Sequence, residues 1–343
     1  MATIQDIARM SGYSIGTVSR VINNRQGVSE SAREKIEEVI REQGYQPNNS
    51  ARMLRQSISS DITVIVRGAN NHFLHTILEK VQNRLREHGE SANVLFIREN
   101  EDEVAAAAQA IQNLKPKGLI FLGGSADAFG GGFDKINVPS VLITAGAEGL
   151  GFDNLSSFTT DDRAAGAFVM RTLVSHGHRR IAILGGYPGD VDASKHSSSP
   201  GTLRIRGAIQ ELEASGISFD PVRDYEACPF STPDGYEAAR RILERTPDLT
   251  ALFAVGDAVA IGALRAIYDM GLTVPDDLSI VGFDGVIITK YSIPRLATIQ
   301  QDAATLAQRG VDDLLMRLSY DRPPVHEKIP YLFIQGESIA SPR

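Results

Sequence analysis

The sequence predicts an α/β protein with a small helical head and a two-lobed, doubly wound body, and three observations support this. The net charge of −7 is uneven, because residues 1–60 carry eight Lys and Arg against six Asp and Glu, whereas residues 61–343 carry 27 against 36. Residues 3–44 hold three short amphipathic patterns. From residue 61 onward, apolar runs of strand length alternate with helical patterns.

Two short helices are predicted at the start of the chain. Thr3 can cap the first, which would end at Gly12. Ser14 can cap a second helix that runs to Asn23. Two helices joined by so short a link have the spacing of a helix-turn-helix.

The second of these helices has two unlike faces at 100° per residue. Its packing face carries apolar side chains: Val18, Val21 and Ile22. The opposite face carries Ile15, Gly16, Ser19 and Arg20. The guanidinium of Arg20 can pair with two acceptors of guanine in a major groove. Taken alone, the same residue could be an ordinary solvated arginine.

A third helix and a short tail complete the head. The helix is predicted from Ser29 or Ser31 to Gly44, with its apolar side chains facing inward: Ala32, Ile36, Val39 and Ile40. Pro47 ends the regular structure, and residues 48–55 allow one or two further helical turns. A helix this short is unstable alone in water, so it needs a partner to fold against.

The body is predicted from short, bounded apolar runs: Ile62–Val66, Val94–Ile97, Gly118–Leu122, Val141–Thr144, Ile181–Leu184, Ala251–Val255 and Ser279–Phe283. The helices between them end at glycines: Gly89, Gly177, Gly216 and Gly271. Strand and helix alternating at this spacing indicate a doubly wound fold. The pattern continues beyond the length of one such sheet and breaks near Asp161, which predicts two lobes with a ligand cleft between them.

Residues 3–55 resemble the DNA-binding head of the LacI/GalR family of bacterial transcriptional regulators. The motifs that carry the resemblance are Thr3–Ala8, Thr17–Asn23, and Tyr45–Asn48 with Ala51, Arg52 and Leu54. The resemblance is weaker over residues 61–160 and strong again at Ser175–Ile181, Gly256–Ala263, Val274–Asp284 and Pro294–Ile299. It implies a body similar to periplasmic sugar-binding proteins.

The resemblance implies three parts. These are a helix-turn-helix domain at 1–47, a hinge helix and linker at 48–60, and an effector-binding and dimerisation domain at 61–343. Within the last part, the N-lobe is expected at 61–160 plus 290–322. The C-lobe is expected at 161–289 plus 323–340.

DNA contacts are also implied by the resemblance. In the family, residues at the positions of Ile15, Gly16 and Arg20 contact bases, and the hinge leucine, here Leu54, enters the minor groove and kinks it. The expected DNA-binding residues are Thr3, Ser14, Ile15, Gly16, Thr17, Ser19, Arg20, Asn23, Asn48, Ala51, Leu54 and Arg55. Gly16 is less typical of the family, which affects the expected base preference rather than the binding.

Effector contacts are carried over in the same way. The expected residues are His72, Phe73, Ser125, Asp161, Arg204, Phe230, Asp257 and Asp284. Carboxylates and a guanidinium can hold hydroxyls, while an aromatic face covers the apolar side of a ligand. Asp257 could instead cap the next helix, and Phe230 could be plain core. The loop at 187–203 is longer than usual in the family and is expected to be a connector or a ligand lid.

Other chemistry is not indicated by the sequence. Cys228 is the sole cysteine, which excludes an internal disulfide and a multi-cysteine metal site. The glycine-rich runs at 123–125 and 130–132 lack the spacing of dinucleotide or phosphate-binding loops. His72 and His75 are three residues apart, and we expect them to be pocket or surface histidines rather than metal ligands. We therefore expect no catalytic residue, cofactor or metal, and no membrane segment.

The expected function is sequence-specific transcriptional regulation, as a repressor, with operator affinity controlled by a small molecule such as a sugar. The expected partners are a pseudo-palindromic DNA operator, the effector and a second copy of the chain. The expected location is the bacterial cytoplasm, at the nucleoid. The alternative is a soluble sugar-binding or sugar-processing protein with no role on DNA.

Overall fold

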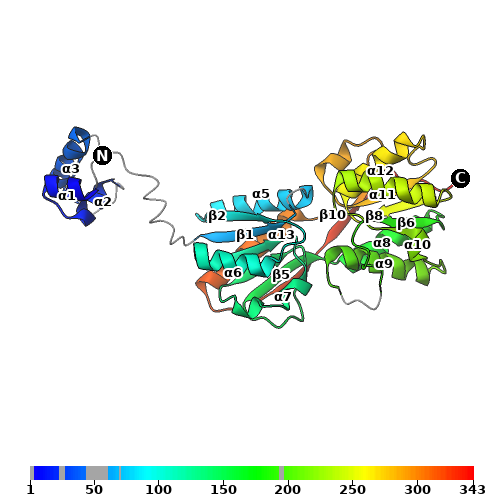
Figure 1. Cartoon of the computed structure of the whole chain (residues 1–343), viewed down its shortest axis with the longest axis horizontal. Helices are drawn as coiled ribbons and strands as arrows, with labels where there is room; N and C mark the ends of the chain where they lie inside the picture. Colours follow the sequence, from blue (N-terminus) through cyan, green and yellow to red (C-terminus); the bar gives the residue numbers. More distant parts are fainter. Residues whose placement is uncertain (1–3, 23–27, 44–60, 69–70, 193–196) are drawn as a thin grey trace. The chain divides into compact units, whose positions relative to one another are not determined.

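The structure is a computed structural model that describes residues 4–22, 28–43, 61–68, 71–192 and 197–343. The chain divides into two compact units, Met1–Ser59 and Ser60–Arg343. The described part of the first unit is helical, and the second unit contains two sheets flanked by helices (Figure 1).

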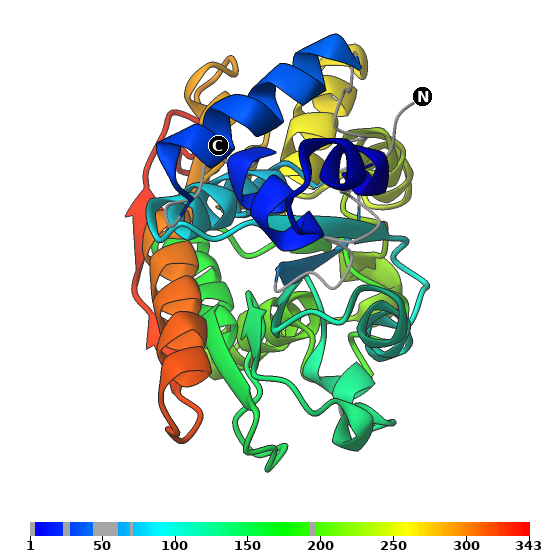
Figure 2. The same cartoon turned by 90° about the vertical axis from the view of Figure 1, so that its left-hand side faces the viewer.

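The first unit holds α1 (Ile4–Ser11), α2 (Ile15–Ile22) and α3 (Glu30–Glu42), drawn in dark blue in Figure 2. The predicted caps between the first two helices are confirmed. Gly12 has a φ of 77°, and the Thr17 backbone N–H donates to the Ser14 hydroxyl at 3.2 Å. The three helices enclose a small apolar core: Ile7, Ala8, Val18, Val21 and Ile36.

The second unit begins with a six-stranded parallel sheet, which we call the N-lobe sheet. Its strand order is β11-β5-β4-β3-β1-β2. The strands are β1 (Ile62–Arg67), β2 (Ala92–Ile97), β3 (Gly118–Leu122), β4 (Ser140–Ile143), β5 (Leu155–Thr160) and β11 (His326–Ile329). One face packs on α5 (His72–Glu87) and α13 (Ala303–Ser319). The other packs on α6 (Glu103–Leu114), α7 (Ala126–Phe129) and η1 (Phe133–Lys135).

A second sheet of six strands forms the C-lobe, in the order β12-β10-β9-β8-β6-β7. Its strands are β6 (Ile181–Leu184), β7 (Tyr225–Glu226), β8 (Ala251–Ala254), β9 (Ser279–Asp284), β10 (Ala297–Gln301) and β12 (Tyr331–Ile334). Only the pairing of β12 with β10 is antiparallel among the strands described. One face packs on α8 (Asp162–Ser175) and α9 (Pro200–Ala214), and the other on α11 (Thr232–Arg245) and α12 (Asp257–Asp269). Short helices lie at α10 (Pro221–Asp224) and η2 (Ile287–Lys290).

The predicted fold class is confirmed, and so are the predicted helix ends. Positive φ angles occur at all four glycines expected there: Gly89, Gly177, Gly216 and Gly271. Each sheet is covered by helices on both faces, which explains why the strand runs are nearly all apolar.

The first crossing between the lobes lies between β5 and α8, near Asp161 as predicted, but the two later crossings lie at residues other than those predicted. The segment 290–322 was assigned to the N-lobe, yet its strand β10 pairs with β9 in the C-lobe sheet. The segment 323–340 was assigned to the C-lobe, yet β11 pairs with β5 in the N-lobe sheet. These short strands carry mixed patterns, so long-range pairing rather than local sequence sets their lobe.

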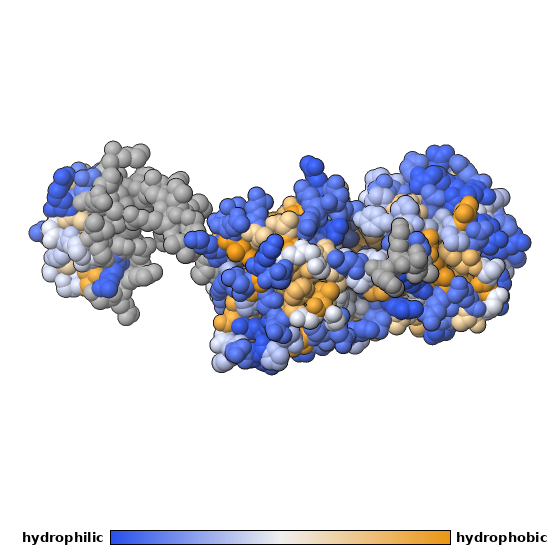
Figure 3. All heavy atoms as spheres, turned by 60° about the horizontal axis from the view of Figure 1, so that its bottom comes forward, coloured by the Kyte–Doolittle hydropathy of each residue, from blue (hydrophilic) through white to orange (hydrophobic). Residues whose placement is uncertain are grey.

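The described surface gives no sign of a membrane segment. Within the described ranges, no helix has both the length and the apolar character needed to cross a bilayer. The face in Figure 3 is mostly hydrophilic on both lobes, with small apolar patches between charged side chains.

Candidate functional site

A cavity of about 520 Å³ is lined by both lobes of the second unit. It lies where strands of both sheets end, the position at which open α/β sheets bind ligands. The N-lobe supplies Arg67, Gly68, Asn71, Phe73, Leu74, Glu99, Gly123, Gly124, Ser125, Asp127, Ala128 and Thr144. The C-lobe supplies Tyr187, Asp190, Ser197, Ser199, Pro200, Gly201, Arg204, Phe230 and Asp284.

Arg204 is the central cation of the C-lobe wall, and its residue is 5% exposed. Its Nε donates to Asp162 Oδ1 at 2.8 Å, and its Nη1 donates to the Val255 carbonyl at 2.7 Å and to Asp284 Oδ1 at 3.3 Å. Its guanidinium also lies 3.6 Å from the centroid of the Phe283 ring. These contacts fix the guanidinium plane, so the cation is oriented by the protein itself.

Close packing of α8 on α9 places Arg204 there. A Cβ at Gly166 would lie 2.1 Å from the Arg204 carbonyl oxygen, and one at Gly207 would lie 2.0 Å from the Arg163 carbonyl oxygen. The two backbones therefore touch, and larger residues at either glycine would separate the helices. This contact brings Asp162, at the start of α8, against the Arg204 side chain.

Asp284 ends β9 with a φ of 115°, a conformation that non-glycine residues rarely adopt. Its Oδ1 accepts from Gln301 Nε2 at 2.8 Å, and Gln301 Oε1 accepts from the Thr160 hydroxyl at 2.8 Å. Thr160 and Gln301 lie where the chain crosses between the lobes. The cavity carboxylate Asp284 is thus connected, through the Gln301 side-chain amide, to two of the three places where the chain crosses between the lobes.

Burial raises the pKa of two carboxyls around Arg204. Burial raises the pKa of Asp162 to about 6, although the nearby guanidinium opposes this shift. Burial also raises the pKa of Asp284, against the same guanidinium. A cation flanked by carboxyls that titrate closer to neutrality than usual marks this wall as a polar binding surface.

The structure places Asp257 behind the cavity rather than in its lining. The residue is fully buried, and its two oxygens accept from the Val286 backbone N–H at 2.9 Å and the Thr298 hydroxyl at 2.7 Å. Burial raises its pKa well above the usual value, and Asp284 nearby adds to the shift. These bonds tie the loop after β9 to β10, so Asp257 shapes the cavity wall from outside.

On the N-lobe wall, Arg67 ends β1 with its side chain 26% exposed. Its Nη1 donates to Glu103 Oε2 at 3.1 Å, and its Nε donates to the Glu99 carbonyl at 2.9 Å. Glu103 is buried beneath it, and burial raises the pKa of this carboxyl while Arg67 opposes the shift. Glu103 Oε1 also accepts from the Ser125 backbone N–H at 3.0 Å, so it fixes the start of α7.

Five of the eight predicted effector residues line the cavity: Phe73, Ser125, Arg204, Phe230 and Asp284. Phe73 is buried in the first turn of α5, where Asn71 caps the helix by accepting its backbone N–H at 2.9 Å. Phe230 is partly buried, and its ring limits the space beside Gly201 and Gly256. The lining thus combines aromatic faces with hydroxyl, amide and charged groups.

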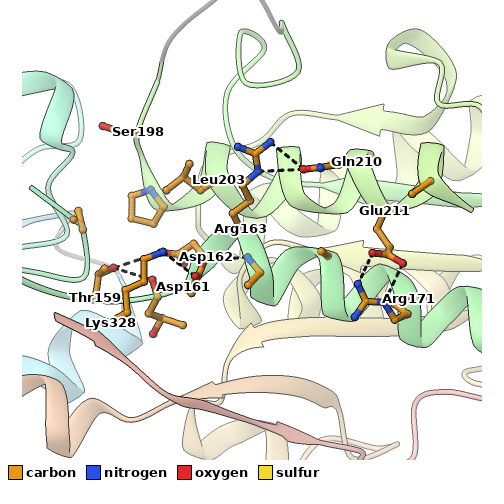
Figure 4. Close-up of a pocket in the computed structure, with 17 residues that line it drawn as sticks. Thr159, Asp161, Asp162, Arg163, Arg171, Ser198, Leu203, Gln210, Glu211 and Lys328 are labelled. Atoms are coloured by element: carbon orange, nitrogen blue, oxygen red, sulfur yellow. Dashed lines mark hydrogen bonds and ion pairs between the residues drawn. The ribbon is translucent and has the colours of Figure 1, made fainter. Parts of the chain in front are cut away.

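Of the other three predicted residues, Asp257 lies behind the cavity as described above, and His72 and Asp161 lie elsewhere. His72 is exposed at the start of α5 and does not line the cavity. Asp161 lines a separate hollow of about 580 Å³ along α8 and α9, where its Oδ2 accepts from Lys328 Nζ at 2.8 Å (Figure 4). Asp161 therefore pairs with β11 of the N-lobe sheet instead of facing the cavity.

The predicted DNA-binding residues fall partly within the described head. Arg20 and Ser14 are exposed and Thr17 is half-buried, while Val18 and Val21 are buried as predicted. Ile15, Gly16 and Ser19 lie on α2, as predicted. Thr3, Asn23, Asn48, Ala51, Leu54 and Arg55 lie outside the described residues.

Several lining residues were not predicted from the sequence. Arg67, Glu99 and Thr144 follow or end parallel strands, and that position alone could have indicated them. Asp127 and Asp190 have no comparable signal, because they reach the cavity through a short helix and a loop.

A helix-turn-helix unit followed by a two-lobed ligand-binding body defines a class of protein: a DNA-binding protein that responds to a ligand. The comparisons with known proteins agree. Residues 3–48 match the family model described as bacterial regulatory proteins, lacI family, and residues 170–339 match the periplasmic binding protein-like domain.

Relatives match along the whole chain. The chain is 31% identical to the HTH-type transcriptional regulator MalR of Clostridium butyricum, over 98% of both chains. It is similar in structure to the lac repressor dimer bound to operator and the anti-inducer ONPF, with 27% identity, a TM-score of 0.74 and 99% of each chain covered. It is also similar to the transcriptional regulator CelR in complex with cellobiose, with 25% identity, a TM-score of 0.71, and 98% of this chain and 100% of that one covered.

The chain belongs to the LacI family of bacterial transcriptional regulators. It is a DNA-binding regulator controlled by an effector, and the family consists of regulators rather than enzymes.

Proposed function

We propose that the effector is an uncharged, polyhydroxylated molecule, a sugar, that binds in the cavity between the lobes. The observation that carries the proposal is the chemistry of the lining. Aromatic rings from both lobes, Phe73 and Phe230, stand among hydroxyl, amide and carboxylate groups. Such a lining can cover the apolar face of a sugar ring and hydrogen-bond its hydroxyls.

The charge of the lining supports a neutral ligand over a phosphorylated one. Among the described lining residues, four carboxylates stand beside two guanidinium groups: Glu99, Asp127, Asp190 and Asp284 against Arg67 and Arg204. Both guanidinium groups already pair with carboxylates. A phosphate would therefore meet excess negative charge. The similarity to CelR in complex with cellobiose also supports a sugar.

A thermal-shift assay on the full-length chain tests the proposal. The panel contains neutral mono- and disaccharides and the phosphate esters of the same sugars. A bound ligand stabilises the folded state by about 2.7 kcal/mol at 100 times its Kd. We expect a neutral sugar to raise Tm and its phosphate ester to do so less or not at all. A rise with phosphate esters alone would contradict the proposal.

We also propose that two copies of the chain bind a pseudo-palindromic operator, since a single small head gains affinity and register from a second half-site. The C-lobe exposes apolar side chains around η2: Ile287 is 66% exposed, Tyr291 74% and Ile293 97%. A second copy is the proposed cover, as the similar lac repressor is a dimer on its operator. Sedimentation should show a dimer that Ile293→Asp weakens, and an unchanged dimer would place the interface elsewhere.

The proposed location follows from the operator. A regulator whose partner is chromosomal DNA acts in the bacterial cytoplasm, at the nucleoid. Chromatin immunoprecipitation in the source cells would show enrichment at a few promoters.

A further inference from the structure

A loop of the C-lobe reaches the N-lobe beside the cavity. Its residues Ser197–Ser199, which we call the strap, precede α9, and Ser197 and Ser199 line the cavity.

One carboxylate of the N-lobe holds the strap. Asp127 Oδ2 accepts from the Ser197 hydroxyl at 2.8 Å, and Asp127 Oδ1 accepts from the Ser198 hydroxyl at 2.6 Å. The Ser198 backbone N–H lies 3.0 Å from both oxygens. Burial opposes ionisation, but the bonds from Ser198 and Ser197 lower the pKa of Asp127, so these hydrogen bonds are charge-assisted at neutral pH.

The strap is tied just as firmly to its own lobe. Ser199 caps α9 by accepting the Thr202 backbone N–H at 3.2 Å, and the Thr202 hydroxyl donates to Asp190 Oδ1 at 2.6 Å. Arg206 Nη1 donates to the Ser197 carbonyl at 3.3 Å. Since these bonds hold the strap to the C-lobe, its bonds to Asp127 join one lobe to the other.

A second contact between the lobes lies at the start of the same loop. The Tyr187 hydroxyl donates to Glu99 Oε2 at 3.2 Å. Burial raises the pKa of Tyr187 to about 12, so this donor stays protonated at neutral pH. Both residues line the cavity. The two ends of the loop thus bond to different carboxylates of the N-lobe, one after β2 and one in α7.

We propose that Asp127 is a positioning residue that latches the strap onto the N-lobe, so that the lobes separate only when this contact breaks. The latch makes Ser197 and Ser199 part of the cavity wall and holds that wall against an effector. That the cavity is the effector site rests on the proposed function. That Asp127 holds the two lobes together does not rest on it, because the separation of the lobes can be measured without effector or DNA.

The test is a distance measurement between the lobes by double electron–electron resonance. Spin labels are attached to the full-length chain at Gln112→Cys on α6 and Glu213→Cys on α9, both at exposed positions. Cys228 is 4% exposed, and burial raises the pKa of its thiol, so we expect the spin label to react at the two introduced cysteines. We expect Asp127→Ala to broaden the distance distribution and add a second population.

Two variants make the result specific. Asp134→Ala removes another exposed N-lobe carboxylate, in η1, and should leave the distribution unchanged. Ser197→Ala with Ser198→Ala removes two donors while the backbone N–H remains, so it should give a smaller change than Asp127→Ala. Added to Asp127→Ala, it should change nothing further.

Faster amide hydrogen exchange at Ser198 in Asp127→Ala would support the latch independently. An unchanged distance distribution in Asp127→Ala, or an equal change in Asp134→Ala, would overturn the proposal. Neither outcome bears on whether the chain binds a sugar or an operator.

Discussion

The two lobes share one architecture but hold their cavity walls differently. In the C-lobe, Arg204 is nearly buried between Asp162 and Asp284, each bonded to it. In the N-lobe, Arg67 is 26% exposed, and Asp127 is exposed and bonded to a loop of the other lobe. The C-lobe groups around Arg204 are fixed by their own lobe, whereas Asp127 of the N-lobe wall bonds to the strap of the C-lobe.

This difference assigns unlike roles to the two walls. A buried cation that is already paired within its own lobe is oriented before any ligand arrives. Little additional conformational entropy is therefore lost when the ligand binds. An exposed wall whose bonds cross to another lobe can withdraw without disrupting its own core. We infer that the C-lobe anchors the effector and the N-lobe closes on it, with Gln301 and Thr160 connecting the anchor to the crossings.

The largest expected effect comes from removing the anchoring cation. Arg204→Ala leaves two buried carboxylates without their partner, and breaking such a pair costs about 3–5 kcal/mol of the free energy of unfolding. Arg67→Ala should cost about 1–2 kcal/mol, because Glu103 keeps the Ser125 N–H and Arg67 is partly solvated. Urea unfolding gives the free energy of unfolding of both variants. Equal losses of this free energy in Arg204→Ala and Arg67→Ala would show that the two cavity walls are not held differently.

A smaller effect is expected in the pH dependence of stability. The pKa of Asp162, usually 3.8, is raised by burial to about 6 in the folded protein, with Arg204 opposing the shift and Asp284 and Asp161 adding to it. Its stabilising contribution is therefore complete below about pH 4 and is lost as the pH rises through about 6. The loss amounts to about 2–3 kcal/mol.

Asp162→Asn isolates this contribution, since the amide oxygen can still accept from Arg204. Relative to this variant, the natural chain should lose stability between pH 4 and pH 6.5. Unfolding curves at several pH values for both proteins give the difference directly. Parallel curves would show that Asp162 does not titrate in this range.

The smallest of the three effects tests how closely the C-lobe helices pack. Gly207→Ala would put a methyl carbon 2.0 Å from the Arg163 carbonyl oxygen, forcing α8 from α9 at a cost of about 2 kcal/mol. Gly131→Ala in the N-lobe meets no atom within 4 Å and should be nearly neutral. The denaturant concentration at the midpoint of unfolding is measured for Gly207→Ala and Gly131→Ala and compared with that of the natural chain. A neutral Gly207→Ala would mean that the helix pair tolerates separation.

Much of the fold follows from local patterns, and the exceptions have physical causes. Apolar strand runs and glycine helix ends gave the α/β class, because helices cover both faces of each sheet. The strand β5 was not predicted, since its Leu-Ser-Ser-Phe-Thr-Thr sequence is polar. Its buried serines are satisfied at long range: Ser157 accepts the Ala147 N–H at 2.9 Å and Ser156 accepts the Val325 N–H at 3.0 Å.

Site residues could be predicted from the sequence where they stand at the end of a strand or within a family motif. Arg204, Asp284 and Phe230 line the cavity, and their contact with an effector stays a prediction. Asp127 and Tyr187 could not be found, because they matter through contacts between lobes that no local pattern encodes. Asp161 lies outside the cavity lining for a related reason, because it pairs with Lys328 of a strand that returns from the far end of the chain.

We propose that occupancy of the cavity by a sugar changes DNA binding by the head. The direct measurement is fluorescence anisotropy of the full-length chain on DNA from its own promoter, at fixed salt, with and without the sugar that raises Tm. We expect the sugar to change DNA affinity by about 5- to 150-fold. We expect Phe230→Ala to bind DNA normally and to respond only at higher sugar concentration. A sugar that stabilises the chain without changing its DNA affinity would show that cavity occupancy does not control DNA binding.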